Sequence, residues 1–238
     1  MTMIMSELDV VDFHAHILPC ADHGSDSINT SLKQLNLAKK HGVKRIIATP
    51  HFYPHRHTLA QFLRKRDSAY HELKKHLQPN MPTVKLGAEV LVCPKMDTME
   101  SLASLCIEGT NVILLELPFG MVEDSIYETI KNLLAQDFKI VIAHADRYAE
   151  NCIDKLISFG CKVQLNANAI DTLFKKKHIY NWAESSSVVA IGSDIHNVDK
   201  SAYKHFSRAI NKFDGYIADI KSSSDKIWNS QIEALITE

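Results

Sequence analysis

Asp-Phe-His-Ala-His, residues 12–16, directly follows the run Leu-Asp-Val-Val at residues 8–11. On an extended strand, side chains two residues apart point to the same face, so His14 and His16 can direct two imidazoles at one point. A second pair, Asp194 and His196, follows the apolar run 188–191 near the other end of the chain. Imidazole and carboxylate groups are metal ligands, so we expect the two pairs to face each other across one metal site.

The composition is that of one large domain. The chain has 238 residues, of which 45% are hydrophobic and 23% charged. A net charge of -1 gives no basic field for nucleic acid, and no apolar run approaches the roughly 18 residues of a membrane span. Five irregularly spaced cysteines argue against a disulfide framework, and residues 1–5 do not resemble a signal peptide. We expect a cytoplasmic protein with a single domain over 1–238.

Short β-branched runs recur along the chain, each followed by a segment with helical periodicity. The seven runs are Leu8–Phe13, Val43–Thr49, Val84–Val92, Val112–Leu117, Lys139–Ala145, Lys162–Ala167 and Val188–Asp194. Alternating strands and helices with short connections predict a parallel sheet with helices outside it. The pattern favours an α/β fold with a closed or nearly closed seven-stranded barrel, and an open doubly wound sheet is the alternative.

Several helices have recognisable ends. The segment from Ser27 to His41 stops at Gly42, and Thr58 can cap a helix that ends near Pro79. Further helices are predicted from residue 124 or 125, over 151–159 and over 200–213. We expect the tail, about 216–238, to form one or two helices that pack outside the barrel.

Each predicted strand but the sixth delivers a metal-binding type of side chain to the end where the active sites of parallel barrels gather. The nine candidates are His14, His16, His23, His51, Glu89, Glu116, His144, Asp194 and His196. Taken alone, Glu116 or His144 would ordinarily be an ion-paired or hydrogen-bonded residue of the core. Burying many such groups without partners costs several kcal/mol each, so their clustering at one rim predicts metal binding.

Six ordered motifs resemble those of the polymerase-and-histidinol-phosphatase (PHP) family over about residues 9–199. They are HxH at 14–16, Ala-Thr-Pro-His at 48–51, Gly-Ala-Glu at 87–89, Leu-Leu-Glu-Leu-Pro-Phe at 114–119, Ile-Ala-His-Ala-Asp-Arg-Tyr at 142–148 and Gly-Ser-Asp-Ile-His-Asn at 192–197. Within the family, the chain most resembles the bacterial capsular- and exopolysaccharide-associated, metal-dependent protein tyrosine phosphatases. That resemblance implies a distorted seven-stranded, TIM-like β/α barrel.

The resemblance also implies two to three divalent transition metals, manganese, zinc or iron. One ion would be held by His14, His16, Glu89 and Asp194. Glu89 would bridge to a second ion, held also by Glu116 and His144. A third ion would be held by His23, His51 and His196. Arg147 matches the family arginine that holds the substrate phosphate.

Two positions depart from the tyrosine-phosphatase branch. That branch has aspartate where this chain has His23, which is the residue type of the histidinol-phosphatase branch. The change removes one negative charge and favours zinc or iron over manganese. The second departure is Ala145-Asp146, which stands where the branch usually has proline and glutamate.

Charge balance favours a phosphate ester over a neutral amide as the substrate. Three carboxylates and three divalent ions leave a site near +3, which a hydroxide and a phosphate dianion would balance. The expected mechanism is in-line attack by a metal-bridging hydroxide, because coordination lowers the pKa of water from 15.7 toward roughly 7. Arg147 would clamp phosphate oxygens, and Asp194 or His196 would protonate the leaving oxygen. A cysteine phosphatase is excluded, because no cysteine has arginine six positions later.

These features predict a metal-dependent protein tyrosine phosphatase that controls capsular or exopolysaccharide biosynthesis. Its partner would be a phosphotyrosine protein, specifically a tyrosine kinase of polysaccharide export. One alternative is a small-molecule phosphatase of the histidinol-phosphate type, which His23 suggests. Another is a non-catalytic, metal-binding scaffold, against which Arg147 and the complete ligand set argue.

Overall fold

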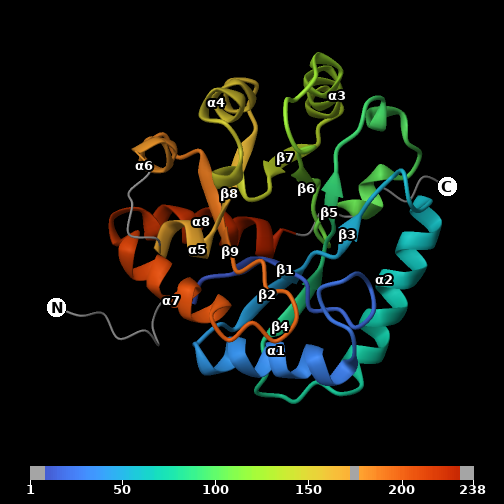
Figure 1. Ribbon diagram of the computed structural model, residues 1–238, viewed down its shortest axis with the longest axis vertical. Helices are drawn as coiled ribbons and strands as arrows, with labels where there is room; N and C mark the ends of the chain where they lie inside the picture. Colours follow the sequence, from blue (N-terminus) through green and yellow to red (C-terminus); the bar gives the residue numbers. More distant parts are fainter. Residues whose placement is uncertain (1–8, 172–176, 231–238) are drawn as a thin grey trace.

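Short parallel strands form one curled sheet in the computed structural model, which describes residues 9–171 and 177–230 (Figure 1). Across the sheet, the order of these nine strands is β3-β5-β6-β7-β8-β9-β1-β2-β4. They are β1 (Asp12–Ala15), β2 (Arg45–Ala48), β3 (His51–Phe52), β4 (Thr83–Leu86), β5 (Glu89–Leu91), β6 (Val112–Glu116), β7 (Lys139–Ile142), β8 (Lys162–Asn166) and β9 (Val188–Gly192). The expected α/β class and barrel-like parallel sheet are confirmed, but the count of seven strands is wrong.

Two interruptions explain the larger number of strands. The segment predicted as one strand over 84–92 is split at Gly87 into β4 and β5. Pro50, which has no N–H to donate to a ladder, separates β2 from β3. Backbone bonds cross both breaks: Gly87 N donates to Ala48 O at 2.9 Å, and Glu89 N donates to Pro50 O at 3.1 Å. The two neighbouring segments therefore stay hydrogen-bonded across the breaks, although each is divided into two shorter strands.

Helices cover the outer face of the sheet (Figure 1). They are α1 (Ile28–Lys40), α2 (Leu59–Lys74), α3 (Asp124–Ala135), α4 (Glu150–Ser158), α5 (Ala167–Asp171), α6 (Lys177–Glu184), α7 (Ala202–Lys212) and α8 (Asp214–Asn229). Short 3-10 turns are η1 (Met96–Thr98), η2 (Leu102–Leu105) and η3 (Ala145–Arg147). The expected helix starts at Ser27 and Thr58 are confirmed, because each side chain accepts a bond from the third backbone N–H after it. The predicted tail beyond residue 230 lies outside the described residues.

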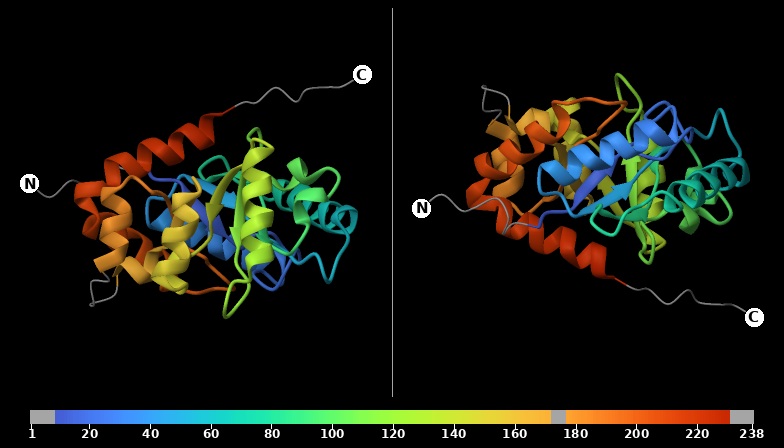
Figure 2. Two further views of the ribbon diagram at one scale, coloured as in Figure 1. Left: turned by 90° about the horizontal axis from the view of Figure 1, so that it is seen from above. Right: turned by 90° about the horizontal axis from the view of Figure 1, so that it is seen from below.

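The sheet separates two hydrophobic cores. Alternate strand residues such as Ile113 and Leu115 face the helices, while Val112 and Leu114 face the other way. The inner core also holds Phe13 and is packed against Trp228 of α8. Helix α8 lies across the end of the sheet where the strands begin, behind the view of Figure 1 (Figure 2). Lys85 Nζ, on β4, donates to Trp228 O at 2.6 Å.

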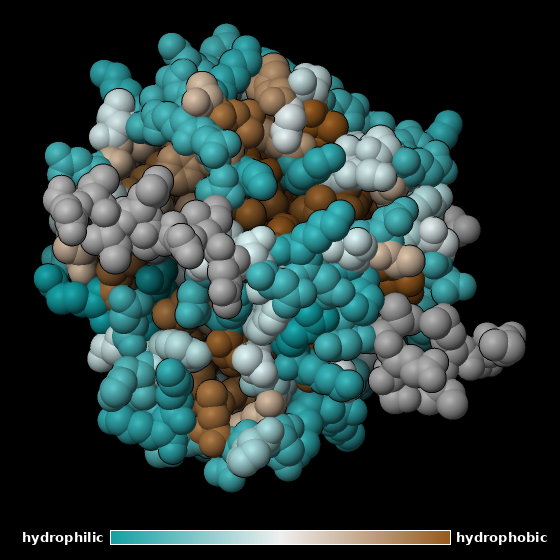
Figure 3. All heavy atoms as spheres, turned by 180° about the vertical axis from the view of Figure 1, so that it is seen from behind, coloured by the Kyte–Doolittle hydropathy of each residue, from teal (hydrophilic) through white to brown (hydrophobic). Residues whose placement is uncertain are grey.

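The surface of the molecule opposite the view of Figure 1 is mostly hydrophilic, with patches of hydrophobic side chains showing between the hydrophilic ones (Figure 3). Within the two described ranges, no helix is both long and apolar enough to cross a bilayer. The opposite end of the barrel, where the strands finish, carries the buried histidines and carboxylates.

Candidate metal centre

The two histidines of the HxH motif and two carboxylates form a tight group at the end of β1. His14 Nε2 and His16 Nε2 lie 3.0 Å apart, and Glu89 Oε2 is 3.1 Å from the first and 3.2 Å from the second. Asp194 Oδ1 lies 3.4 Å from His16 Nε2 and 3.7 Å from His14 Nε2. Four ligands about 2.1 Å from one ion in a tetrahedron would be about 3.4 Å apart. The spacing of these four atoms therefore fits a single metal ion.

Glu89 faces a second group of ligands with its other carboxylate oxygen. Glu89 Oε1 lies 2.7 Å from His144 Nε2, which is 3.7 Å from Glu116 Oε1. On the side of Glu89 Oε2, which faces His14 and His16, His51 Nδ1 lies 2.9 Å from this oxygen and 3.8 Å from Glu116 Oε2. Glu89 is fully buried between the two groups, which is the position that a bridging carboxylate needs.

A third group consists of imidazoles at the outer side of the site. One ligand atom each from His16, His51 and His196 can be chosen so that all three lie within 4.8 Å of one another. His23 is exposed, and its ring stacks on His51 at 4.9 Å between centroids and lies 4.7 Å from that of His196. His23 thus lies at the edge of this group, and buried His16 lies inside it.

Several buried polar atoms of the site have no hydrogen-bond partner among the described residues. They are His51 Nδ1 and Glu89 Oε2, which lie 2.9 Å apart without hydrogen-bond geometry, together with His144 Nδ1 and His196 Nε2. An orphaned buried donor or acceptor costs about 1–3 kcal/mol, and native proteins rarely tolerate several together. Cations would satisfy the carboxylate oxygen and the imidazole lone pairs that converge here, so the residues present fit divalent metals.

The electrostatics of the site also call for positive charge. Burial opposes ionisation of Glu89, but the neighbouring His14 and the hydrogen bonds of the imidazoles hold the pKa of Glu89 well below its usual range. Burial, and then repulsion from Glu89, raises the pKa of Glu116 to about 7. Burial lowers the pKa of His196 to about 4, so this imidazole is neutral and its lone pair is free for a ligand. A nearby cation would let Glu116 ionise as well as Glu89.

Two polar side chains that the sequence reasoning missed orient the imidazoles. Asp22 Oδ2 accepts from His16 Nδ1 at 2.7 Å and from the backbone N of His51 at 3.0 Å. Gln164 Oε1 lies 3.1 Å from His14 Nδ1 and accepts from the backbone N of His144 at 2.7 Å. Such bonds fix the Nδ1–H tautomer and leave Nε2 for a metal. The one available signal was a glutamine inside the apolar strand 162–166.

Glycines and unusual backbone conformations make room for the histidines. A Cβ on Gly24 would lie 2.0 Å from His16 Cβ, and one on Gly192 would lie 2.5 Å from His14 Cβ. Two candidate ligands are themselves in left-handed conformations, with φ of 32° at His144 and 51° at Asp194. Left-handed conformations of non-glycine residues carry strain and cluster at functional sites.

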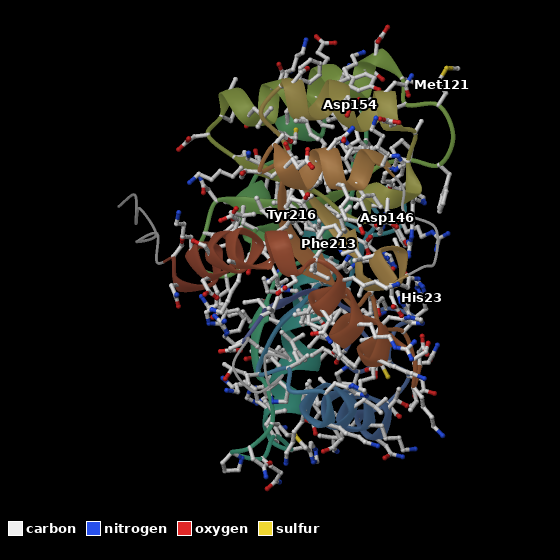
Figure 4. All side chains as sticks on the ribbon, turned by 90° about the vertical axis from the view of Figure 1, so that its left-hand side faces the viewer. His23, Met121, Asp146, Asp154, Phe213 and Tyr216 are labelled. Carbon is white, nitrogen blue, oxygen red and sulfur yellow. The ribbon has the colours of Figure 1, made fainter. Side chains whose placement is uncertain are left out.

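Arg147 lies at the rim of the site, where its side chain is 44% exposed and pairs with Asp194 Oδ2. It lines a hollow of about 600 Å³ together with Glu116 and His196. The neighbouring departure, Asp146, turns away to a structural contact, in which its Oδ1 accepts from Asn166 N at 2.8 Å. Figure 4 shows Asp146 further inside the molecule than His23, which stands at the edge of the same face. The guanidinium of Arg147 can therefore contact an anion in this hollow.

Comparisons with known proteins identify related sequences. A family model described as capsular polysaccharide synthesis, CpsB/CapC, matches residues 10–217. The chain is 26% identical over 205 residues to the tyrosine-protein phosphatase YwqE of Bacillus subtilis (strain 168), covering 79% of this chain and 78% of that protein. It is also 26% identical over 212 residues to the tyrosine-protein phosphatase CpsB of Streptococcus pneumoniae, covering 80% and 84%.

The fold is shared with a solved structure. Crystal structures described as YwqE from Bacillus subtilis and CpsB from Streptococcus pneumoniae, unique metal-dependent tyrosine phosphatases, include a chain that superposes with a TM-score of 0.78. The alignment has 22% sequence identity and covers 94% of this chain and 96% of the other. It shows that the two chains have the same architecture.

Proposed function

This chain belongs to the CpsB/CapC family of capsular polysaccharide synthesis, and from that premise we propose that it is a metal-dependent phosphotyrosine-protein phosphatase. The family expected from the six motifs is thereby confirmed. The similarity to YwqE and CpsB, both called tyrosine-protein phosphatases, supports the activity. The proposed substrate is a phosphotyrosine protein of capsule or exopolysaccharide synthesis, specifically a tyrosine kinase of polysaccharide export in the cytoplasm.

One observation carries the proposal: the two carboxylate oxygens of Glu89 face two separate groups of ligand atoms, with Arg147 at the rim. Two cations a few ångströms apart, with an arginine beside them, form a site for a phosphate dianion. We propose two to three divalent ions, held by the nine residues named from the sequence. The high proportion of imidazole ligands favours zinc or iron, with manganese as the harder alternative.

Bound metals would supply a water ligand of lowered pKa and would neutralise charge on the phosphoryl oxygens. The chain's own residues do the remaining work. Arg147 Nη2 would exchange its contact with Asp194 for the phosphate oxygens, which it can bind with two parallel bonds. Asp22 and Gln164 hold the imidazoles in place. The proton for the leaving tyrosyl oxygen, expected from Asp194 or His196, needs another source. Burial lowers the pKa of His196 to about 4, and His14 and His16 outweigh burial to hold the pKa of Asp194 far below its usual range.

A small-molecule phosphatase remains the second candidate, because His23 replaces the aspartate of the tyrosine-phosphatase branch. His23 stacks on His51 at the exposed edge of the site, so it can contact either a small substrate or a protein surface. Histidinol phosphate and a phosphotyrosyl peptide, assayed side by side with the same preparation, separate the two functions. We expect a higher kcat/KM for the peptide, and the reverse order would favour the second candidate.

The decisive experiment combines elemental analysis with kinetics. Purified protein should carry two to three equivalents of transition metal, and hydrolysis of p-nitrophenyl phosphate should disappear with chelator and return with Mn²⁺, Zn²⁺ or Fe²⁺. Arg147→Ala should lower kcat/KM for p-nitrophenyl phosphate on the order of 10²-fold with unchanged metal content. Arg147→Lys should recover part of the loss. A folded, metal-loaded protein without phosphatase activity would contradict the proposal.

A further inference from the structure

The loop between β6 and α3 exposes two large apolar side chains beside the candidate site. Phe119 is 90% exposed and Met121 is 92% exposed, and no other large hydrophobic side chain in ranges 9–171 and 177–230 is exposed to this degree. The loop directly follows Glu116, one of the proposed ligands. Figure 4 shows Met121 projecting from this loop on the edge of the molecule that also carries His23. Adjacent apolar side chains exposed at one point of a surface typically mark a binding site.

A groove under this loop is continuous with the site. It has a volume of about 680 Å³, and its walls include Phe119, Met121, Tyr127, Tyr148, Cys152 and Lys155. Phe119 and Arg147 line both this groove and the hollow over the metal ligands. We call it the Phe119 groove. A ligand that reaches Arg147 from the metal side therefore extends directly into it.

The walls of the Phe119 groove are held in place by specific contacts. Tyr148 Oη accepts from Leu117 N at 3.1 Å and donates to Leu117 O at 3.2 Å. Tyr127 is covered by Lys155, whose Nζ lies 3.5 Å from the ring centroid, and its hydroxyl donates to Cys152 Sγ. Because these rings are already fixed, ordering them on binding would cost little conformational entropy. The groove is thus preformed, aromatic and mostly neutral.

We propose that the Phe119 groove binds an apolar side chain next to the phosphotyrosine of the protein substrate, an inference that rests on the proposed function. A phosphate held by Arg147 places the substrate backbone one tyrosine ring away from the metal ligands, at the rim of the hollow. Residues on either side of the phosphotyrosine then lie over the surface that Phe119 and Met121 expose. Phosphotyrosine proteins with an apolar flanking residue are the substrates that this surface selects.

Continuity with the Arg147 hollow is the reason to assign the groove to the substrate. A membrane surface would need a broader apolar area with several basic residues, whereas here Lys155 lies 3.6 Å from the carboxylate of Asp124. A second copy of the chain bound at Phe119 would stand at the mouth of the hollow, where it would obstruct a protein substrate.

The test compares a peptide with a small ester on the metal-loaded, full-length protein. The double variant Phe119→Ala, Met121→Ala should lower kcat/KM about tenfold for a phosphotyrosyl peptide with leucine next to the phosphotyrosine. Met121→Ala alone, at a residue that lines the groove and not the hollow, should lower kcat/KM for the peptide about threefold and leave kcat/KM for p-nitrophenyl phosphate within about twofold of the wild type. Met81→Ala is the matched control, because Met81 is a half-buried methionine before β4, at the opposite end of the barrel.

A second measurement leaves the enzyme unchanged. Replacing the flanking leucine of the peptide by serine should lower kcat/KM of the wild-type protein to a similar extent and should have little effect on the double variant. Equal losses on both substrates, or no loss on the peptide, would overturn the inference. A wild-type protein that hydrolyses neither substrate would instead overturn the proposed function. Sedimentation that shows a dimer only for the wild type, with unchanged peptide turnover, would assign the groove to self-association and overturn the inference.

Discussion

The two ends of the barrel are built on opposite principles. Where the strands begin, Trp228 of α8 packs against the apolar inner core, and Arg45 Nη2 pairs with Asp225 Oδ1 at 2.7 Å. Where the strands end, the inward-facing side chains are histidines and carboxylates whose polar atoms lie 2.7–3.8 Å apart. The first end removes apolar area from water, which stabilises the fold. The second end gathers charged groups, whose burial does not stabilise the fold.

This difference separates stability from function along one axis of the molecule. At the site end, burial raises the pKa of Glu116 to about 7, and His144 and Asp194 adopt left-handed backbone conformations. Each of these features lowers the stability of the metal-free protein, and cation binding would offset this loss. Substitutions at the site end should therefore reduce activity more than stability, and substitutions under α8 should do the reverse.

The largest effect should come from Glu89→Gln, which keeps the size of the side chain but removes the charge that faces both ligand groups. We expect kcat/KM for p-nitrophenyl phosphate to fall on the order of 10³-fold, about 4 kcal/mol, with a lower metal content. The melting temperature of the chelated protein should change little, because the loss of the contacts with His14 and His144 is offset by removal of the charge that repels Glu116. A variant with full activity and full metal content would remove Glu89 from the centre of the site.

A smaller effect is expected from Asp22→Asn, because Asp22 contacts the candidate ligands only through hydrogen bonds. Its carboxylate accepts from His16 Nδ1 and from His51 N, so the amide would leave the orientation of His16 less well fixed. Partners of this kind are worth 10- to 100-fold in metal affinity, about 1.4–2.8 kcal/mol. Titration of the chelated protein with Zn²⁺ measures the affinity directly. Wild-type affinity in the variant would show that Asp22 has no positioning role.

Much of the fold, and the shared direction of the two histidines at 14 and 16, was predictable because the signals are local. His14 and His16 share one face of a strand, and Thr58 stands at the start of a periodic apolar segment, so short windows of sequence contain both patterns. The order of apolar runs likewise indicated a parallel α/β sheet. These features depend on neighbours within a few residues, which the sequence displays directly.

Features that depend on distant partners were not predictable in the same way. Gln164 acts on His14 from 150 residues away, and nothing near it in the chain indicates that contact. Phe119 and Met121 lie in a stretch that reads as apolar, and only the folded loop shows that both are exposed. The strand count failed because Gly87 interrupts the run 84–92, which was predicted as one strand, and because β3 begins after Pro50, beyond the predicted run 43–49.

The smallest expected effect lies at the other end of the barrel, in Trp228→Ala. The indole is half-buried against the inner core and lies 5.4 Å from Lys85 Nζ and 5.8 Å from Arg45 Cζ, measured to the ring centroid. Truncating a buried tryptophan costs about 3–5 kcal/mol, so a half-buried one should cost about 1.5 kcal/mol of the free energy of unfolding. Urea unfolding followed by circular dichroism measures this loss, and Lys226→Ala, at an exposed position of the same helix, should change it by less than about 0.5 kcal/mol. Because α8 and the candidate ligands are at opposite ends of the barrel, kcat/KM per folded molecule of Trp228→Ala should equal that of the wild type. A large loss of activity without a loss of stability would mean that the two ends are coupled through the inner core.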